Sequence, residues 1–192
     1  MAAQAPHIQR RPALRPLLIT AILLSIGLIL PFLTGQVQVL GQAISPLHIP
    51  VFICGLCCGF GWGAALGVLL PLLRSVLFGM PPLVPMAIPM AFELAVYGAI
   101  CGLLYPRLRK KCTYPIVAML LSMLVAKIPG CLLGGAVKAL VMGLEGNTYS
   151  FHAFLTGYFT STAVGTLLHF LLVPAIVTAL EKAGLSPLVA KD

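Results

Sequence analysis

Long apolar stretches alternate with short polar connections along the whole chain. The first stretch, residues 16–34, contains no charged side chain. At about 1.5 Å per helical residue it is long enough to cross a hydrocarbon core of about 30 Å. The pattern predicts an all-α membrane protein with a single transmembrane domain over residues 1–192. A mobile basic segment, 1–15, would precede six transmembrane helices at approximately 16–34, 47–60, 62–78, 85–105, 114–142 and 151–180.

The number of helices depends on residues 47–78, which are too many for one membrane span and contain the helix-breaking sequence GFGWG at 59–63. With two spans there, the N-terminal arginines, the RLRKK segment at 107–111 and the C-terminal lysines fall on one side of the membrane. No Lys or Arg occurs in the connections on the other side, which are 35–46, 79–84 and 143–151. The positive-inside rule therefore favours six spans with both termini in the cytoplasm.

The composition and motifs exclude several classes of protein. Hydrophobic residues make up 60% of the chain and charged residues only 8%, too few to cover a water-facing surface. Six spans leave no room for a soluble catalytic or nucleotide-binding domain. No phosphate-binding loop, serine-hydrolase or zinc-protease motif occurs, and Cys54, Cys57 and Cys58 lack a second Cys or His pair at ligand spacing. We expect no catalytic residue, no metal site and no nucleic-acid partner.

Four charged residues lie inside the expected spans: Arg74, Glu93, Lys127 and Lys138. Each costs about 2.5–3.5 kcal/mol at the centre of a membrane helix, so they should face a water-filled cavity or each other. An ion pair between Arg74 and Glu93 would hold two spans together, but it would leave Lys127 unexplained. One carboxylate against three cations instead suggests a cavity that neutralises its surplus charge with an anionic ligand such as a carboxylate.

Further polar side chains are expected near the outer face of the membrane. His48 begins the second span, and the segment EGNTYSFHAF, 145–154, follows the fifth. Hydrogen-bonding groups with aromatic edges at the mouth of a cavity suit a small organic molecule. His169 would contribute only if it faced the cavity. The predicted substrate-binding residues are His48, Arg74, Glu93, Lys127, Asn147, Tyr149 and His152.

Small residues recur at every fourth position on several spans, as at Gly59, Gly63 and Gly67. Such stripes let helix backbones approach closely in lipid, and most of them should pack within the bundle. The pair Ala21 and Ser25 lies on the first helix, which is the helix most easily presented to another membrane protein. Among the small-residue stripes, this pair is therefore the candidate for contact with a partner membrane protein.

The segment LHIPVFICGLCCGFGWGAALGVLLPLLRSVLFG, 47–79, resembles the signature region of S components, the substrate-binding membrane subunits of energy-coupling factor (ECF) vitamin transporters. The resemblance lies in the His-Ile-Pro-Val start, the Gly-rich hairpin of two short helices and the third helix, and it extends to length, six-span arrangement and a basic stretch after the fourth span. It implies a multi-pass protein of a prokaryotic plasma membrane that captures a vitamin or similar micronutrient from outside the cell.

The resemblance also implies partner proteins. Such subunits dock onto a transmembrane coupling (T) component that carries two cytoplasmic ATPases, so ATP would be used by the partners and no cofactor would be bound by this chain. The docking patch of the family is typically Ala-x-x-x-Ala, and the matching positions here are Ala21 and Ser25.

Together, the residues and the resemblance predict the high-affinity substrate-capture subunit of an ATP-driven ECF-type importer. Because of the surplus positive charge, the substrate would bear a carboxylate and be pantothenate-like or folate-like. The single tryptophan, Trp62, lies at a predicted cytoplasmic turn, which disfavours a Trp-stacked aromatic cation. Two alternatives stay open: a non-transporting membrane scaffold or assembly protein in which the buried charges pair, and an autonomous small-solute carrier.

Overall fold

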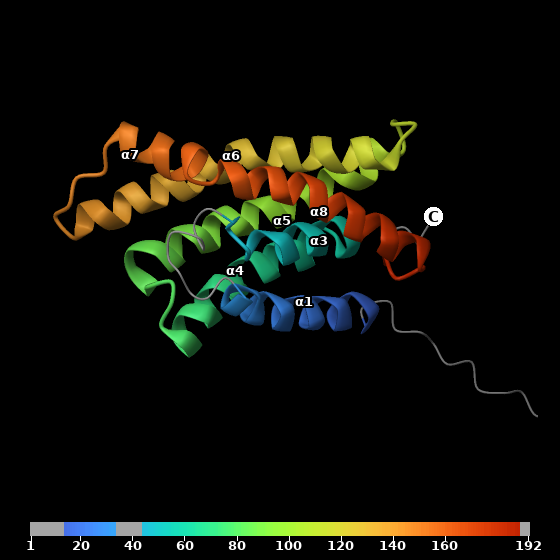
Figure 1. Cartoon of the computed structure of the whole chain (residues 1–192), viewed down its shortest axis with the longest axis horizontal. Helices are drawn as coiled ribbons and strands as arrows, with labels where there is room; N and C mark the ends of the chain where they lie inside the picture. Colours follow the sequence, from blue (N-terminus) through green and yellow to red (C-terminus); the bar gives the residue numbers. More distant parts are fainter. Residues whose placement is uncertain (1–13, 34–43, 189–192) are drawn as a thin grey trace, which may run out of the picture.

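The computed structural model describes residues 14–33 and 44–188, and all regular elements in these ranges are helical. Most of the basic N-terminal segment predicted over 1–15 lies outside the described residues. The long helices run side by side as a bundle (Figure 1). The elements, in which η marks a π-helical segment, are α1 (Leu14–Leu33), α3 (His48–Cys58), α4 (Phe60–Phe78), η1 (Leu83–Ala87), α5 (Ile88–Arg109), α6 (Pro115–Leu144), α7 (Phe151–Leu155), η2 (Thr156–Thr160) and α8 (Ala163–Lys182).

Within the described ranges, five helical stretches are long and apolar enough to cross a membrane: Leu14–Phe32, Phe60–Phe78, Leu83–Arg109, Pro115–Leu144 and Phe151–Lys182. The shorter apolar helix α3 is the sixth. The structure therefore confirms the prediction of an all-α bundle of six helices. Large apolar side chains cover the outside of the bundle, as expected for a surface in contact with lipid tails.

Helix α3 lies at the centre of the bundle (Figure 1). All of its residues except Ile49 are buried, and it contacts α1, α4, α5 and α8. Its 11 residues extend for about 16 Å, roughly half the thickness of a hydrocarbon core. The second predicted span is therefore a half-length helix. Its first residue, His48, is buried inside the protein.

A single residue, Gly59, joins α3 to α4 and reverses the chain. Its φ of 98° lies in a region that L side chains rarely adopt, so this turn requires glycine. Helix α4 then packs backbone to backbone on α5, because a methyl group at Gly67 would lie 2.5 Å from the backbone nitrogen of Ala95. The predicted glycine stripe thus packs within the bundle.

Two of the long helical stretches are irregular. Helix α6 continues through Pro129 and bends along its length (Figure 1). A proline removes one N–H group, and the turns on either side keep their own hydrogen bonds. The last predicted span begins as α7 and η2, and a turn at 161–162 separates them from α8. Single π-helical turns of this kind are frequent at functional sites.

The bundle is closed at one end by contacts between α5 and α8. Arg109 Nη1 lies 2.6 Å from Glu181 Oε1, and the Tyr105 hydroxyl donates to the same oxygen at 2.5 Å. The Leu188 N–H donates to the Cys57 carbonyl at 3.1 Å, which fastens the chain after α8 to the C-terminal end of α3. The two ends of the bundle therefore differ, since the polar groups described next lie at the opposite ends of α5 and α8.

Candidate functional site

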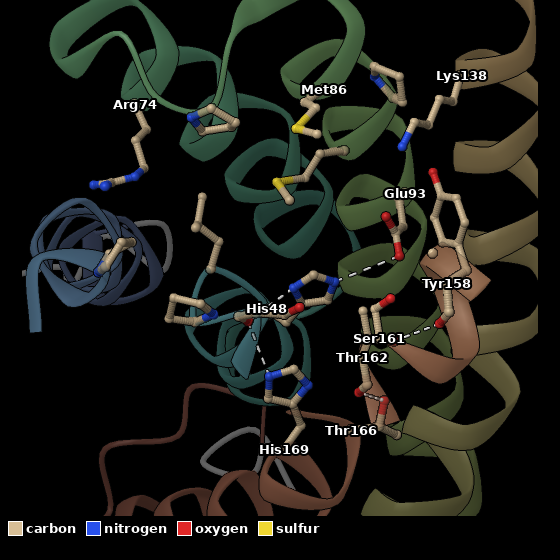
Figure 2. A pocket seen from close by; sticks show the side chains of 18 of the residues that line it. His48, Arg74, Met86, Glu93, Lys138, Tyr158, Ser161, Thr162, Thr166 and His169 are labelled. Atoms are coloured by element: carbon tan, nitrogen blue, oxygen red, sulfur yellow. Dashed lines mark hydrogen bonds and ion pairs between the residues drawn. The ribbon is translucent and has the colours of Figure 1, made fainter. Parts of the chain in front are cut away.

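A cavity of about 240 Å³ lies in the half of the bundle away from the Arg109 ion pair. The N-terminal end of α3 forms its floor, and α5, α6, η2 and the start of α8 form much of its wall (Figure 2). The lining residues are Pro31, Ser45, Pro46, Leu47, His48, Arg74, Met80, Pro81, Pro82, Met86, Pro89, Met90, Glu93, Lys127, Lys138, Gly157, Tyr158, Ser161, Thr162, Thr166 and His169.

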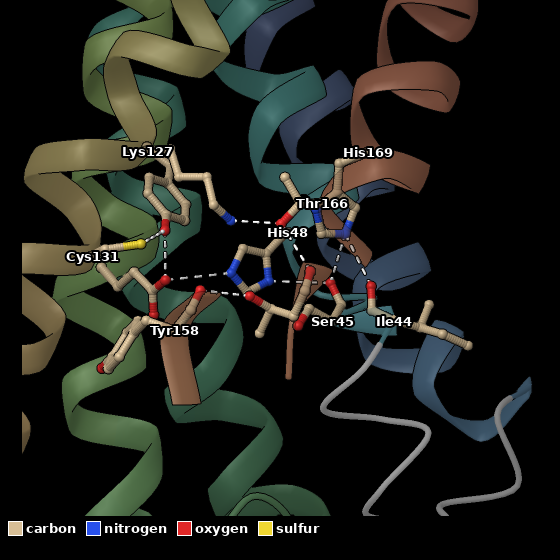
Figure 3. A network of polar contacts seen from close by, with 11 residues as sticks. Ile44, Ser45, His48, Lys127, Cys131, Tyr158, Thr166 and His169 are labelled. Carbon is tan, nitrogen blue, oxygen red and sulfur yellow. Dashed lines mark hydrogen bonds and ion pairs between the residues drawn. The ribbon is translucent and has the colours of Figure 1, made fainter. Parts of the chain in front are cut away.

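Two stacked histidines fix the floor of the cavity (Figure 3). The ring centroids of His48 and His169 lie 5.3 Å apart. His48 Nδ1 is 3.1 Å from the Ser45 carbonyl oxygen. His169 Nε2 is 3.0 Å from the carbonyl oxygen of Ile44 and 3.2 Å from that of Ser45. Because a carbonyl can only accept, both ring nitrogens donate, and the two rings hold the chain before α3 against α8.

Among the described residues that line the cavity, Glu93 on α5 is the only acidic one. Its Oε1 accepts a hydrogen bond from the Tyr97 hydroxyl at 2.6 Å and lies 3.7 Å from His48 Nε2. The Tyr97 hydroxyl is also 3.0 Å from Cys131 Sγ. The other carboxylate oxygen, Oε2, receives no hydrogen bond from the described residues and can accept one from a molecule in the cavity. The ion pair with Arg74 that the sequence left open is not formed.

Two lysines on α6, Lys127 and Lys138, line the cavity. Lys127 Nζ donates to the Thr166 hydroxyl at 2.7 Å. Lys138 was not among the predicted binding residues, yet Figure 2 shows it on the same side of the cavity as Glu93. Its Nζ lies 5.4 Å from the centroid of the Tyr149 ring. Within the described part of the chain, this ammonium group has neither a hydrogen-bond acceptor nor an ion-pair partner.

Arg74 lines the cavity on the side of α1, and its guanidinium points toward that helix (Figure 2). Nη1 donates to the Leu28 carbonyl at 2.6 Å. The group lies 5.1 Å from the ring centroid of Phe32 and 5.5 Å from that of Phe78. A carbonyl oxygen has two lone pairs, so the Leu28 oxygen can accept from Arg74 as well as from its own helix. Arg74 therefore links α4 to α1.

Three of the predicted residues, in the chain that follows α6, do not line the cavity. Asn147 and His152 are exposed. Tyr149 covers Lys138, and its buried hydroxyl has no hydrogen-bond partner among the described residues. Burial, and to a lesser extent the charge of Glu93, raises the pKa of Tyr149 above the ordinary value, so this hydroxyl keeps its proton.

The structure adds polar residues that the sequence analysis did not identify. Tyr158 lines the cavity from η2, Ser161 and Thr162 from the turn that follows, and Thr166 from α8; His169, which the sequence analysis named only on the condition that it faced the cavity, also lines it from α8. The first four are uncharged and cost little in an apolar helix, so a search for buried charges passes over them. The one available signal was the concentration of hydroxyl residues at the start of the last span.

Glycines on α6 allow these side chains to converge. A methyl group at Gly134 would lie 2.9 Å from Cβ of Glu93 and 3.1 Å from the Tyr158 hydroxyl oxygen. A methyl group at Gly135 would lie 2.5 Å from Cδ2 of Phe154. Larger residues would push α5 and the α7–η2 segment away, so the shape of the cavity depends on small residues in α6.

The arrangement suits the binding of a small polar anion. Cationic donors project from α6, acceptors lie on α5 and near the start of α8, and methionines and prolines provide apolar surface. In the part of the chain that the structure describes, no three His, Cys, Asp or Glu side chains are grouped to hold a metal ion. Cys54, Cys57 and Cys58 are buried in α3 and pack in the core.

The two positions predicted for docking, Ala21 and Ser25, are exposed on α1. Ser25 Oγ donates to the Ala21 carbonyl at 3.0 Å, so its hydroxyl hydrogen is used within the helix. Large apolar side chains such as Leu18, Ile22 and Ile29 are exposed on the same helix. This helix can therefore offer a smooth apolar surface to lipid or to another membrane protein.

Comparison with known proteins gave one result that bears on function. A family profile described as "ECF transporter, substrate-specific component" matches residues 15–191. The matched range includes every residue that lines the cavity. A search of curated proteins and a search of solved structures each gave no match.

Proposed function

The chain belongs to the family of substrate-specific (S) components of ECF transporters, and from that premise we propose that its cavity captures a small, carboxylate-bearing vitamin or related micronutrient. ECF S components are transporter subunits, not enzymes, and work with a T component and ATPases. Membership of the family favours this function over the scaffold and the autonomous carrier that the sequence left open.

The observation that carries the proposal is the ammonium group of Lys138. It reaches the cavity without an acceptor among the described residues, although an ammonium group has three donors and is costly to bury without partners. A ligand carboxylate would supply the acceptors for Lys138, and Lys127, which lies about 16 Å away along α6, would donate its remaining N–H groups to another acceptor of the ligand. Such charge-assisted hydrogen bonds are roughly twice as strong as neutral ones.

The size of the cavity favours the smaller of the two predicted substrate types. Its volume of about 240 Å³ is below the range of about 300–1,000 Å³ that is typical of pockets for drug-sized ligands. A pantothenate-like molecule, which is short and aliphatic, suits this volume and the methionine-rich apolar surface. A folate-like molecule adds fused aromatic rings and is less well accommodated.

We assign the other predicted binding residues roles that follow from their positions. Glu93 and His48 would hydrogen-bond the ligand at the floor, and Arg74 would shape the wall next to α1. Tyr149 would cover the carboxylate held by Lys138. Asn147 and His152 would line the path by which the ligand enters.

We further propose that the cavity opens to the outside of the cell. The basic RLRKK segment, 107–111, lies at the end of α5 away from the cavity, and the positive-inside rule favours the cytoplasm for that end. Both termini would then be cytoplasmic. Ala21 and Ser25 would dock onto the T component, because small exposed residues let another helix approach closely.

The experiment that tests this function is to purify the chain in its native membrane lipids and identify any bound molecule by mass spectrometry. We expect a small carboxylic acid that is bound tightly by the chain alone. Uptake into proteoliposomes should appear only after a T component and its ATPases are added. A bound molecule without an acidic group would contradict the proposed ligand class, and uptake by the chain alone would support an autonomous carrier.

A further inference from the structure

We propose that the ligand also carries hydroxyl or N–H donors at a distance from its carboxylate, because part of the cavity wall presents only hydrogen-bond acceptors. This inference rests on the proposed function and specifies the chemistry of its ligand. It follows from the acceptors to which the hydroxyl hydrogens of this wall are already donated.

Three hydroxyl side chains lie in a row along one wall of the cavity (Figure 2). Ser161 Oγ donates to the Thr156 carbonyl at 2.9 Å. Thr162 Oγ1 donates to the Tyr158 carbonyl at 2.6 Å, and Thr166 Oγ1 donates to the Thr162 carbonyl at 2.8 Å. A hydroxyl has a single hydrogen, so each of these donors is used by the backbone. What each oxygen still offers to a ligand is its lone pairs.

Two of these oxygens, together with Glu93, remain open as acceptors. Thr166 Oγ1 already accepts from Lys127 Nζ, whereas nothing among the described residues donates to the hydroxyl oxygens of Ser161 and Thr162. Glu93 Oε2 is likewise without a donor, since the hydrogen bond from Tyr97 goes to Oε1. We call these three atoms, Ser161 Oγ, Thr162 Oγ1 and Glu93 Oε2, the acceptor wall.

The acceptor wall complements the lysines of α6. Lys138 provides donors at one end of the cavity, and the row of hydroxyls runs from there toward the floor (Figure 2). The Tyr158 hydroxyl, which lies between them, can donate or accept. A ligand with its carboxylate at Lys138 would therefore place its remaining length against acceptors.

This distribution discriminates between acids. A fatty acid can satisfy Lys138, but it gives no donor to the carboxylate oxygen of Glu93, to the half-buried hydroxyl oxygen of Thr162 or to the more exposed one of Ser161. An acid that carries hydroxyl or amide N–H groups satisfies both ends of the cavity. Sites that desolvate polar groups reject analogues that lack the matching group, by about tenfold or more for each missing hydrogen bond.

The test compares three acids by calorimetric titration of the full chain in lipid nanodiscs. Pantothenate has a carboxylate, an amide and two hydroxyls. N-(3,3-dimethylbutanoyl)-β-alanine differs only by lacking both hydroxyls, and octanoate keeps only the carboxylate. We expect the dissociation constant to rise at least tenfold when the hydroxyls are removed, and to rise further for octanoate.

A matched pair of variants locates the effect. Thr162→Val keeps the shape of the side chain but removes the acceptor, and it should weaken pantothenate about tenfold while changing the affinity for the dehydroxylated analogue less than twofold. Thr178→Val is the control, because Thr178 Oγ1 in α8 makes the same kind of hydrogen bond, donating to the Pro174 carbonyl at 2.7 Å, but does not line the cavity. Thr178→Val should leave both affinities unchanged.

The outcomes separate this inference from the proposed function. Equal affinity for pantothenate and its dehydroxylated analogue, or tight binding of octanoate, would overturn the acceptor wall while leaving the capture of a carboxylic acid intact. An equal loss for both ligands in Thr162→Val would also overturn it, since that result indicates packing. If none of the three acids binds, the proposed function fails together with the inference.

Discussion

Replacing Lys138 by Met removes one ammonium group and keeps an unbranched side chain of similar length on α6. Lys138 is half-buried, lines the cavity and has no acceptor among the described residues. We therefore expect Lys138→Met to weaken the binding of an acidic ligand. The substitution should not disturb the fold, because removing a charge from a membrane helix lowers the cost of inserting that helix.

The size of the effect follows from the interaction of two charges at the edge of the bundle. Two unit charges about 4 Å apart interact by about 4 kcal/mol at an effective dielectric constant of about 20. Loss of hydration offsets part of this, and hydrogen bonds to charged groups contribute about 1.5–3 kcal/mol net. Because about 1.4 kcal/mol corresponds to a factor of ten, the dissociation constant should rise about 10- to 150-fold.

The assay is calorimetric titration of the wild type and Lys138→Met in nanodiscs, with pantothenate and with pantothenol, in which an alcohol replaces the carboxylate. Only pantothenate should lose affinity in the variant, since only pantothenate carries the partner charge. Lys182→Met is the matched control, because Lys182 is exposed at the far end of α8. An unchanged dissociation constant for pantothenate, or the same loss for both ligands, would refute the assignment of Lys138 as the carboxylate-binding group.

Three further substitutions test other parts of the structure. Arg74→Leu should lower the thermal midpoint of unfolding but reduce ligand affinity less than tenfold, because the guanidinium hydrogen-bonds the Leu28 carbonyl and so links α4 to α1. A larger loss of affinity with an unchanged midpoint would contradict this structural role. Ala21→Trp should abolish uptake in proteoliposomes that contain the T component and ATPases while leaving binding unchanged, since this residue is exposed on α1; normal uptake would remove it from the docking surface. Gly134→Ala should destabilise the protein by about 1–3 kcal/mol in denaturation experiments, because its methyl group would lie 2.9 Å from a side chain of α5. Gly143→Ala is the control and should not destabilise the protein, because a methyl group at Gly143 would have no atom within 4 Å. Equal stability of the two variants would show that the close packing at Gly134 is unimportant.

The sequence identified several cavity residues as polar or charged side chains whose presence in an apolar helix needs an explanation. His48, Arg74, Glu93 and Lys127 all lie at the cavity, and three of them were found simply as charges inside apolar spans. The cost of burying a charge is large enough to make such positions informative without any knowledge of contacts. Hydroxyl residues carry no comparable cost, which is why Ser161, Thr162 and Thr166 were missed.

The direction in which each charge points could not be predicted. The sequence allowed Arg74 to pair with Glu93, but the guanidinium bonds a carbonyl of α1 that lies 46 positions away in the chain. That contact depends on the packing of α4 against α1. The burial of His48 could not be predicted either. It follows from the half-length of α3, because a helix of 11 residues places its first side chain deep in the bundle.

The sequence by itself determined that this protein is a helical membrane bundle and which charged side chains lie within its apolar helices. These properties follow from the transfer of each residue into lipid, which depends on residue type and spacing alone. Only the tertiary structure decided which groups meet, which hydrogen-bond donors are already used and which acceptors remain for a ligand. Those outcomes depend on helix rotation and on close backbone packing at glycines, where a shift of an ångström exchanges one partner for another.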